Sequence, residues 1–381
     1  MSSGPPSGSY LPGMDGLRAL AALGVFCVHL NQILDVDLYW GAFDLGLLMR
    51  NGEVGVALFF VLSGFLLSRP FLAHLRDGAP RPSLRQYWLH RTVRILPAYY
   101  LCLALLVWLS GTWRTPEGRL DVLLHLLFIF NLAEFSILSI NPVFWTLAVE
   151  MQFYLLLPLV MLLHRRLRFW LLIIACASYL VHAGLNHWFA WRIPWPWSDW
   201  QLWLRPHGAV LNHSLFGHLP HFVLGVVAAT LADRPPLRNV AQRGAGAAWL
   251  LLFGTLTLLL GTGWADWFGL PYGPYDLPGV PLTLALLVLL TPHADPVLQV
   301  LECSPVRYLG RISYGIYLYH LPVMWLVDRQ LMLRGWDAQA YGWQFSLAAL
   351  SLSVAAASLS FFLVERPLQR LARHSDDSRP A

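Results

Sequence analysis

Ten long apolar stretches dominate this sequence and constrain its fold more than any other feature. A helix needs about 20 mostly apolar residues to cross a lipid bilayer, and most of the stretches are close to that length. Only 12% of the residues are charged, about half the share found in soluble domains, which is too little to cover a water-soluble surface. The sequence therefore predicts an all-α, polytopic membrane bundle of about ten transmembrane helices, at residues 17–34, 54–72, 92–111, 143–163, 169–186, 218–233, 246–262, 277–292, 312–333 and 343–364.

The two ends of the chain differ from this apolar body. Residues 1–13 are rich in Ser, Gly and Pro and lack the basic region of a signal peptide, so we expect a disordered N-terminal tail there. The membrane domain is predicted over residues 14–370. Residues 371–381 are predicted to form a cytoplasmic C-terminal tail.

A further apolar segment, residues 121–138, is interrupted by Asp121, His125, Asn131 and Glu134. Arginines accumulate in cytoplasmic loops, and this rule decides whether the segment crosses the membrane. With ten spans and a cytoplasmic N-terminus, 18 arginines face the cytoplasm and seven lie outside. If residues 121–138 crossed, twelve of those 18 would move outside. We therefore expect a short re-entrant or interfacial helix near 121–138.

The same distribution predicts a multi-pass protein of the inner (plasma) membrane with both termini in the cytoplasm. It also accounts for the net charge of +5, because the excess of arginine lies in the predicted cytoplasmic loops. No nucleic-acid partner is expected.

Two ionisable residues share one face of the first predicted helix. Arg18 and His29 are eleven residues apart, which is about three full turns and roughly 16 Å along the axis. Ionisable side chains inside membrane helices are costly and are functional candidates by default. His29 is therefore a candidate catalytic group, and a hydrogen-bonded contact between helices is the alternative.

Glu150, in the predicted helix 143–163, falls at a depth similar to that of His29. A buried carboxylate needs a partner, and His29 is the candidate. Such a pair would fix the imidazole tautomer and raise its basicity, as general-base catalysis requires. A purely structural ion pair is the alternative.

Arg91 and Arg94 are spaced i, i+3 at the cytoplasmic end of the third predicted helix, so they project from one face. Two guanidinium groups there fit a phosphate clamp. They equally fit topology anchors that reach lipid phosphates, and the residue pattern alone leaves both interpretations open.

Other polar or small residues mark the remaining helices. Ser63 and Gly64 indicate either a packing notch between helices or a substrate contact. Ser313, Tyr317 and His320 fall on one helical face, which is predicted to point into the bundle. The sequence Glu365-Arg366-Pro367 is interpreted as the end of the last helix.

The loop at residues 187–217 contains six tryptophans. Tryptophans at this level of a membrane protein commonly form an interfacial belt. A platform for sugar rings is the alternative, and the sequence does not separate the two.

Taken together, five motifs resemble those of acyltransferase family 3, whose members are integral membrane enzymes that O-acylate carbohydrates and other acceptors. The resemblance covers about residues 14–370, with His90 and Met151 standing where an Arg and a Glu are common in the family. The matching motifs are Arg18 with His29, Phe59 to Gly64, Arg91 to Pro97, Trp145 to Glu150, and Ser313 to His320.

The resemblance implies an acyl-CoA donor substrate, most commonly acetyl-CoA, that enters from the cytoplasmic side. It implies a carbohydrate or glycolipid acceptor at the outer face, in contact with membrane lipids, and neither a permanently bound cofactor nor a metal. Direct transfer and transfer through a brief acyl-enzyme intermediate on His29 are both left open, and so is a separate acyl-accepting partner protein. The residues expected to act in catalysis are His29, Glu150 and Arg18, and those expected to bind substrate are Arg91, Arg94, Ser63, Trp145, Tyr317 and His320.

A transporter or flippase of a lipid-linked or acylated molecule is the main alternative function. Many transporters contain internal repeats and paired broken helices, and neither is recognisable in this sequence. Release of free thiol from acetyl-CoA would distinguish an enzyme from a transporter.

Overall fold

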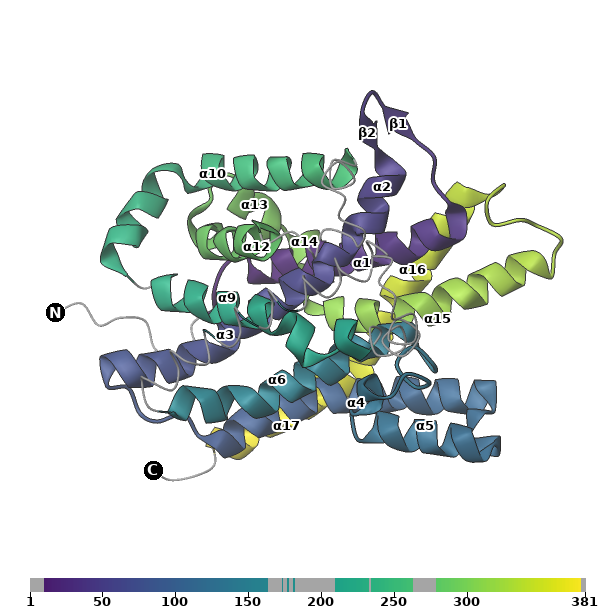
Figure 1. Ribbon diagram of the computed structural model, residues 1–381, viewed down its shortest axis with the longest axis horizontal. Coiled ribbons are helices and arrows are strands. Elements are labelled where there is room, and N and C mark those ends of the chain that lie inside the picture. Colours follow the sequence, from purple (N-terminus) through teal and green to yellow (C-terminus); the bar gives the residue numbers. More distant parts are fainter. Residues whose placement is uncertain are drawn as a thin grey trace, which may run out of the picture. The chain divides into compact units, whose positions relative to one another are not determined.

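The computed structural model describes residues 10–163, 210–232, 234–262 and 279–377, together with positions 173, 177 and 181. These residues are mostly helical (Figure 1). Seven helical segments among them are long and apolar enough to cross a membrane, so the predicted helical membrane architecture is confirmed while the count of about ten is not. The seven are Met14–Leu34, Leu45–Asp77, Leu84–Ser110, Pro142–Leu162, Val210–Ala232, Gly244–Gly261 and Gly342–Ala372.

Three predicted spans explain the difference. The span at 169–186 lies outside the described residues, apart from three isolated positions. The span at 277–292 corresponds to the shorter apolar helix α12 (Gly279–Leu290). The span at 312–333 corresponds to α15 (Ser313–Met332), which has sufficient length but a more polar composition.

The chain divides into two compact units. Unit 1 comprises Met1–Arg81 and Leu156–Arg311, and unit 2 comprises Pro82–Leu155 and Ile312–Ala381. The elements of unit 1 are α1 (Met14–Leu34), β1 (Tyr39–Trp40), β2 (Phe43–Asp44), α2 (Leu45–Arg50), η1 (Asn51–Glu53), α3 (Val54–Asp77), α9 (Leu215–Ala232), α10 (Pro235–Gly261), α12, η6 (Thr291–His293), α13 (Val297–Leu301) and α14 (Ser304–Arg311).

Small residues bring the central helices of unit 1 into close contact. A Cβ atom on Gly55 of α3 would collide with the carbonyl oxygen of Ala21 on α1. On the same helix, a Cβ on Gly64 would collide with the carbonyl oxygen of Phe222 on α9. Small residues drive helix association in membranes because they let backbones approach. The predicted packing notch is therefore present at Gly64.

Unit 2 is built around a second set of helices. Its elements are α4 (Leu84–Ser110), η2 (Thr112–Arg114), α5 (Pro116–Leu126), η3 (Phe130–Leu132), η4 (Pro142–Phe144), the part of α6 (Trp145–Leu162) up to Leu155, α15, α16 (Gly342–Ser360), the π-helical turn η7 (Phe361–Glu365) and α17 (Arg366–Asp377). Helix α15 packs along α16, where Gly315 faces the backbone of Ala357.

The short helix predicted near 121–138 begins and ends earlier, as α5. Its start is set by Thr115, whose hydroxyl accepts a hydrogen bond from the Gly118 N–H at 3.0 Å, and by Pro116 in the first turn. Soon after its end, Phe128 adopts a left-handed conformation with φ of 56°. Eleven residues give a length of about 17 Å. That is too short for one helix to cross a hydrocarbon core of about 30 Å.

The all-α class is confirmed apart from one short hairpin, and one local prediction, the end of the last helix, is wrong. The chain after α1 forms a small antiparallel hairpin, β1–β2, which the all-α prediction lacks. The last helix does not end at Glu365–Pro367 but continues as α17 to Asp377. Pro367 follows the π-helical turn η7 (Phe361–Glu365), where the regular α-helical hydrogen-bond pattern is already interrupted.

Candidate functional site

His29 lies half-buried on α1, and its tautomer is set by its own helix. The Nδ1 atom is 3.0 Å from the carbonyl oxygen of Val25. A carbonyl only accepts hydrogen bonds, so Nδ1 carries the proton and a neutral ring keeps its lone pair on Nε2. This is the tautomer that a general base acting through Nε2 requires.

Arg18 lies on the same uninterrupted helix, close to its N-terminal end. Its Nη1 is 3.4 Å from Asp15 Oδ1, and Asp15 Oδ2 is 3.9 Å from Arg311 Nε on α14. Asp15 precedes Arg18 by three residues, so this ion pair draws the guanidinium towards the start of α1 and away from His29.

Ser63 sits half-buried on α3, beside the close contact made by Gly64. One turn earlier, Phe60 stacks on Phe222 of α9 with ring centroids 4.6 Å apart. The ring of His218 lies 5.2 Å from Phe60 and 5.7 Å from that of His221. The predicted motif Phe59 to Gly64 is therefore packed against α9.

The two imidazoles on α9 are site candidates that the sequence analysis missed. His218 and His221 are both buried, and the Nε2 of His218 donates a hydrogen bond to the carbonyl of Asn212 at 2.8 Å. Their i, i+3 spacing inside an apolar segment is a signal that could have found them, since such residues are functional candidates.

Unit 2 brings Glu150, Arg91 and Arg94 into one electrostatic cluster. The hydroxyl of Tyr154 donates to the carboxylate of Glu150, and the hydroxyl of Tyr87 donates to the Tyr154 carbonyl at 3.1 Å. Arg91 lies near enough to Arg94, Glu150 and both tyrosines to interact with them electrostatically. Two basic groups and one carboxylate thus meet in unit 2.

One hydrogen-bond donor of Arg91 has no partner among the described residues. Its Nε is buried and makes no hydrogen bond with any residue in the described part of the chain. Buried donors are nearly always satisfied, so an orphaned one calls for an explanation such as a ligand.

Glu365, which the sequence analysis assigned to a helix end, belongs to this side of unit 2. Its side chain is only 3% exposed. It accepts a hydrogen bond from Ser360 at 3.1 Å, and Arg94 lies within electrostatic range. Glu365 closes the π-helical turn η7, and such turns are frequent at functional sites.

The polar stripe of α15 is buried, as predicted. Tyr317 donates a hydrogen bond to the carbonyl of Val143 at 2.9 Å, and its hydroxyl is 2.6 Å from that of Thr146. His320 Nδ1 lies 2.8 Å from the Tyr317 carbonyl, so this histidine also carries its proton on Nδ1. Trp145 is half-buried at the first position of α6, directly beside Thr146.

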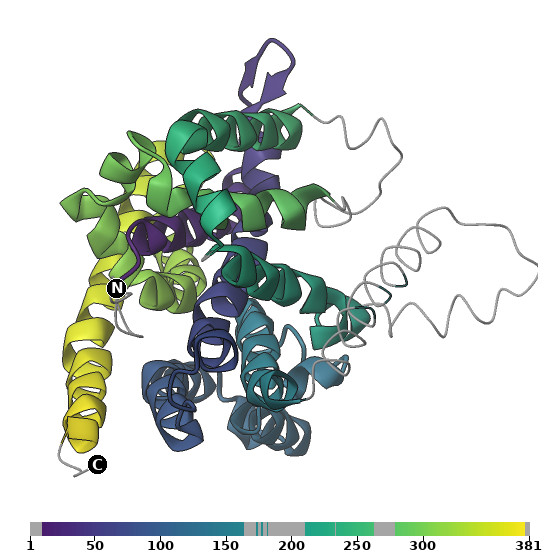
Figure 2. The same cartoon turned by 90° about the vertical axis from the view of Figure 1, so that its left-hand side faces the viewer.

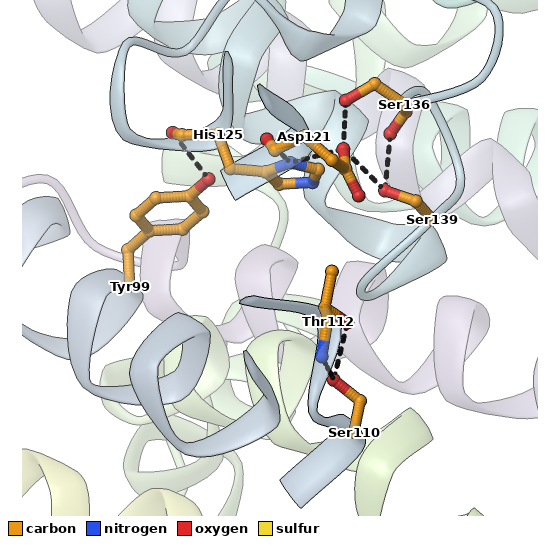
Figure 3. A network of polar contacts seen from close by, with 7 residues as sticks. All are labelled: Tyr99, Ser110, Thr112, Asp121, His125, Ser136 and Ser139. Carbon is orange, nitrogen blue, oxygen red and sulfur yellow. Dashed lines mark hydrogen bonds and ion pairs between the residues drawn. The ribbon is translucent and has the colours of Figure 1, made fainter. Parts of the chain in front are cut away.

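A second polar cluster ties α5 to the segment that follows it (Figure 3). Asp121 accepts hydrogen bonds from Ser136 and, at 3.0 Å, from Ser139, and its Oδ1 is 3.2 Å from His125 Nδ1. The ring of His125 stacks on Phe130 with centroids 3.9 Å apart. Burial disfavours the charged form of Asp121, but the hydrogen bonds from His125, Ser136 and Ser139 outweigh it and hold the pKa of the carboxyl below its ordinary value.

This cluster explains how a polar segment is accommodated in an apolar chain. Irregular backbone at membrane depth is tolerated only where protein or a water-filled cavity surrounds it. The hydroxyl of Tyr99 donates to the His125 carbonyl at 3.0 Å, and Asn141 donates to the Leu318 carbonyl at 3.2 Å. The segment is therefore fastened inside unit 2 to α4 and α15.

The site residues predicted from sequence thus fall in both units. Arg18, His29 and Ser63 belong to unit 1, and the other six belong to unit 2. The predicted pairing of His29 with Glu150 would join the two units and stays a prediction. Within unit 2, Glu150 has Tyr154 as a hydrogen-bond partner.

Comparison with known proteins gives an independent view of this chain. A family model described as an acyltransferase domain matches residues 11–365. The peptidoglycan O-acetyltransferase OatA of Listeria monocytogenes is 26% identical over 96% of this chain and 56% of its own length. The putative peptidoglycan O-acetyltransferase YrhL of Bacillus subtilis is 26% identical over 94% of this chain and 55% of its own length. No solved structure matches significantly.

A putative O-acetyltransferase of Staphylococcus aureus is 24% identical over 98% of the chain and 59% of its own length. The chain therefore spans little more than half the length of these curated relatives.

Proposed function

The chain belongs to acyltransferase family 3 and carries several helices of membrane-spanning length. From that premise we propose that it is an integral membrane O-acyltransferase. It moves an acyl group, most simply acetyl, from acyl-CoA on the cytoplasmic side to a hydroxyl of a cell-envelope carbohydrate. The observation that carries this proposal is the tautomer of His29 on a membrane-length helix.

His29 is the general base in this mechanism. Its Nδ1–H is held by the Val25 carbonyl, so Nε2 is the ring nitrogen that takes the proton of the acceptor hydroxyl. The oxygen attacks the thioester carbon, the acyl–oxygen bond forms and the acyl–sulfur bond breaks. The proton then passes from Nε2 to the departing thiolate, so no proton is gained or lost overall. Transfer through a brief acyl-histidine intermediate would use the same nitrogen.

Arg91 and Arg94 hold the phosphates of the donor. The buried, unsatisfied Nε of Arg91 supports this role over that of a lipid anchor, because an anchor would place its donors at the membrane surface. Guanidinium groups bind phosphate oxygens through paired, charge-assisted hydrogen bonds. Glu365, buried near Arg94, orients that arginine.

Glu150 acts as a positioning carboxylate that orients His29 when the donor is bound. Its hydrogen bond from Tyr154 limits the rotamers of the carboxylate. The remaining predicted substrate-binding residues, which contact the donor or the acceptor in this proposal, are Ser63, Trp145, Tyr317 and His320.

Arg18 acts on the acyl-CoA donor in this proposal. Its ion pair with Asp15 directs the guanidinium away from His29, about three turns along the helix. This geometry favours electrostatic attraction of the donor over stabilisation of an oxyanion at His29.

The acceptor is proposed from the relatives, two of which are named as peptidoglycan O-acetyltransferases. A carbohydrate of the cell envelope is met at the outer face, so the proposal includes an inner-membrane location with cytoplasmic termini. That orientation is supported by the distribution of arginine between the two sides.

A thiol-release assay tests the proposed function. The chain in lipid nanodiscs is mixed with acetyl-CoA, with and without peptidoglycan fragments, and free thiol is measured. We expect release that depends on the acceptor and is lost in His29→Ala and His29→Gln. The matched control is His74→Gln, because His74 on α3 also contacts a backbone carbonyl, that of Ala79, through Nδ1 at 2.7 Å, and should leave the rate unchanged.

Two results would contradict the proposal. The first is an unchanged rate in both His29 variants. The second is movement of a lipid-linked substrate across the nanodisc or vesicle membrane without thiol release, which would indicate a flippase.

A further inference from the structure

The hairpin β1–β2 presents an exposed pair of aromatic side chains. Trp40 is 88% exposed, more than any other large apolar side chain in the described part of the chain, and Tyr39 is 63% exposed. The hairpin extends beyond α2 and α10 in both views (Figure 1, Figure 2). Burying large aromatic side chains is strongly favourable, so their display at a tip calls for a functional explanation.

The base of this hairpin is held firmly. The Leu45 N–H donates to the Leu38 carbonyl at 2.9 Å, and Gly46 packs so closely on Val36 that a Cβ would collide with its carbonyl oxygen. Asp44 caps α2 by accepting a hydrogen bond from the Leu47 N–H at 3.0 Å. The aromatic tip is therefore displayed on a rigid support, which lowers the entropy cost of binding.

The hairpin is also fixed to α10. Phe43, which pairs with Trp40 across the two strands, fills the space that a side chain on Gly261 would occupy. Asn51, just after α2, donates to the Leu260 carbonyl at 2.7 Å. Trp40 and Phe43 thus form one aromatic face of the hairpin, and Phe43 packs against α10 of unit 1.

The opposite face combines an aromatic ring with charged groups. Tyr39 pairs with Asp44 across the strands, so these two side chains lie on one face of the hairpin. Tyr39 also makes a hydrogen bond with Asp37. Arg50 lies 3.2 Å from Asp44. A flat ring beside carboxylate acceptors and a guanidinium donor suits a sugar, which has apolar ring faces and a rim of hydroxyls.

Charge distinguishes a glycan from a lipid surface as the occupant. Residues 35–44 contain Asp35, Asp37 and Asp44 and no basic residue. Like charges repel over distances up to about the Debye length, so this segment disfavours anionic headgroups. A hydroxyl-rich polysaccharide of low charge meets no such repulsion.

We propose that the β1–β2 hairpin is a docking element for the acceptor polysaccharide, with Tyr39 and Trp40 stacking on sugar rings and Asp37 accepting hydrogen bonds from hydroxyls. The inference rests on the proposed function, because it assumes that the acceptor is a carbohydrate. The hairpin follows directly after α1, the helix that carries His29. It holds one part of a long acceptor while another hydroxyl of that acceptor reacts.

Binding of short and long glycans tests this docking element. Isothermal titration calorimetry on the full chain in nanodiscs compares N-acetylglucosamine with its β-1,4-linked hexamer. The hexamer should bind at least about tenfold more tightly than the monomer to the unaltered chain. Tyr39→Ala and Trp40→Ala should each reduce this preference by about three- to tenfold, the loss expected for one aromatic contact.

Trp343→Ala is the matched control, since Trp343 on α16 is also highly exposed but lies outside the hairpin; it should keep the full preference for the hexamer. Asp37→Asn should weaken hexamer binding without lowering the thermal stability of the protein. An unchanged preference in both aromatic variants would overturn the proposal, and that is the result expected if Trp40 only anchors the hairpin in the membrane interface. Failure of the unaltered chain to prefer the hexamer would overturn it as well.

Thiol release measured on the same samples separates the two proposals. Release from acetyl-CoA with no effect of the hairpin variants on glycan binding overturns the docking element alone. Loss of hexamer binding in those variants without any thiol release from the unaltered chain overturns the acyltransferase proposal and shows the hairpin to be a glycan-binding element of another activity.

Discussion

The hydroxyl of Tyr154 donates a hydrogen bond to the carboxylate of Glu150, one turn earlier on α6. The same tyrosine receives a hydrogen bond on its carbonyl from Tyr87 of α4. Glu150 is therefore oriented by a neighbour on its own helix, within electrostatic reach of Arg91.

Tyr154→Phe removes this orienting hydrogen bond while keeping the aromatic ring. We expect the maximal rate of thiol release to fall about tenfold, which corresponds to about 1.4 kcal/mol of activation free energy, with little change in the KM for acetyl-CoA. Tyr100→Phe is the control, because the Tyr100 hydroxyl donates only to the Leu126 carbonyl outside this cluster. Equal rates in the two variants would argue against a positioning role for Tyr154.

Arg91→Ala should raise the KM for acetyl-CoA about tenfold and weaken the salt dependence of donor binding, because one phosphate contact is lost. Arg91→Lys should recover only part of the affinity, since an ammonium lacks the planar fork of a guanidinium. Arg85→Ala provides the comparison from the exposed start of the same helix. Steady-state kinetics at several salt concentrations measure both effects. An unchanged KM for acetyl-CoA in Arg91→Ala would exclude binding of the donor phosphates by Arg91.

Gly64→Ala should destabilise the protein by about 1–3 kcal/mol, the usual cost of overpacking, because its Cβ would meet the Phe222 carbonyl of α9. Thermal unfolding in nanodiscs measures the effect. Gly254→Ala on α10 has open space at its Cβ and should be neutral or stabilising, since alanine favours a helix over glycine. If both variants unfold alike, the close α3–α9 contact does not contribute to stability.

Asp121→Asn should lower stability by about 1–3 kcal/mol at neutral pH, because the carboxylate accepts hydrogen bonds from Ser136 and Ser139. The folded-state pKa of Asp121 lies below its ordinary value of 3.8. Its contribution is therefore present in full well above pH 3.8, and it is lost as the pH falls through the lowered pKa.

Unfolding temperatures measured from pH 7 down to pH 3 test this sign. The difference between the unaltered protein and Asp121→Asn should be largest near neutral pH and should shrink in acid. Asp337→Asn, at an exposed position, is the control and should change the unfolding temperature little at neutral pH. A difference that grows as the pH falls would be inconsistent with the hydrogen-bonded carboxylate.

Much of the candidate site could be predicted without coordinates. Arg18 with His29, Arg91 with Arg94, and Ser313 with Tyr317 and His320 were placed on shared faces by their spacing along one helix. The structure bears out the helices that carry them and the burial of the α15 stripe. Each of these inferences concerns residues within about three turns of one another.

Other features needed neighbours that are distant in sequence. Glu365 was assigned to a helix end because nothing near it in sequence shows Arg94, 271 residues earlier, within electrostatic range. The spacing of His218 and His221 is visible in the sequence, but the packing of His218 against Phe60 on another helix is not. The boundaries of α5, in contrast, are set locally, because the Thr115 cap and the Phe128 turn override the apolar pattern.

By itself, the sequence determined that this chain is a helical membrane protein with the ordered motifs of one acyltransferase family. Helix length, apolar runs and motif spacing are local properties, so they can be read from the sequence without knowing how the helices pack. Only the tertiary structure decided that Gly64 meets Phe222, that Tyr87 joins Tyr154 at Glu150, and that an anchored hairpin displays Trp40. These contacts depend on how side chains from distant segments fill space together, and no local pattern specifies that arrangement.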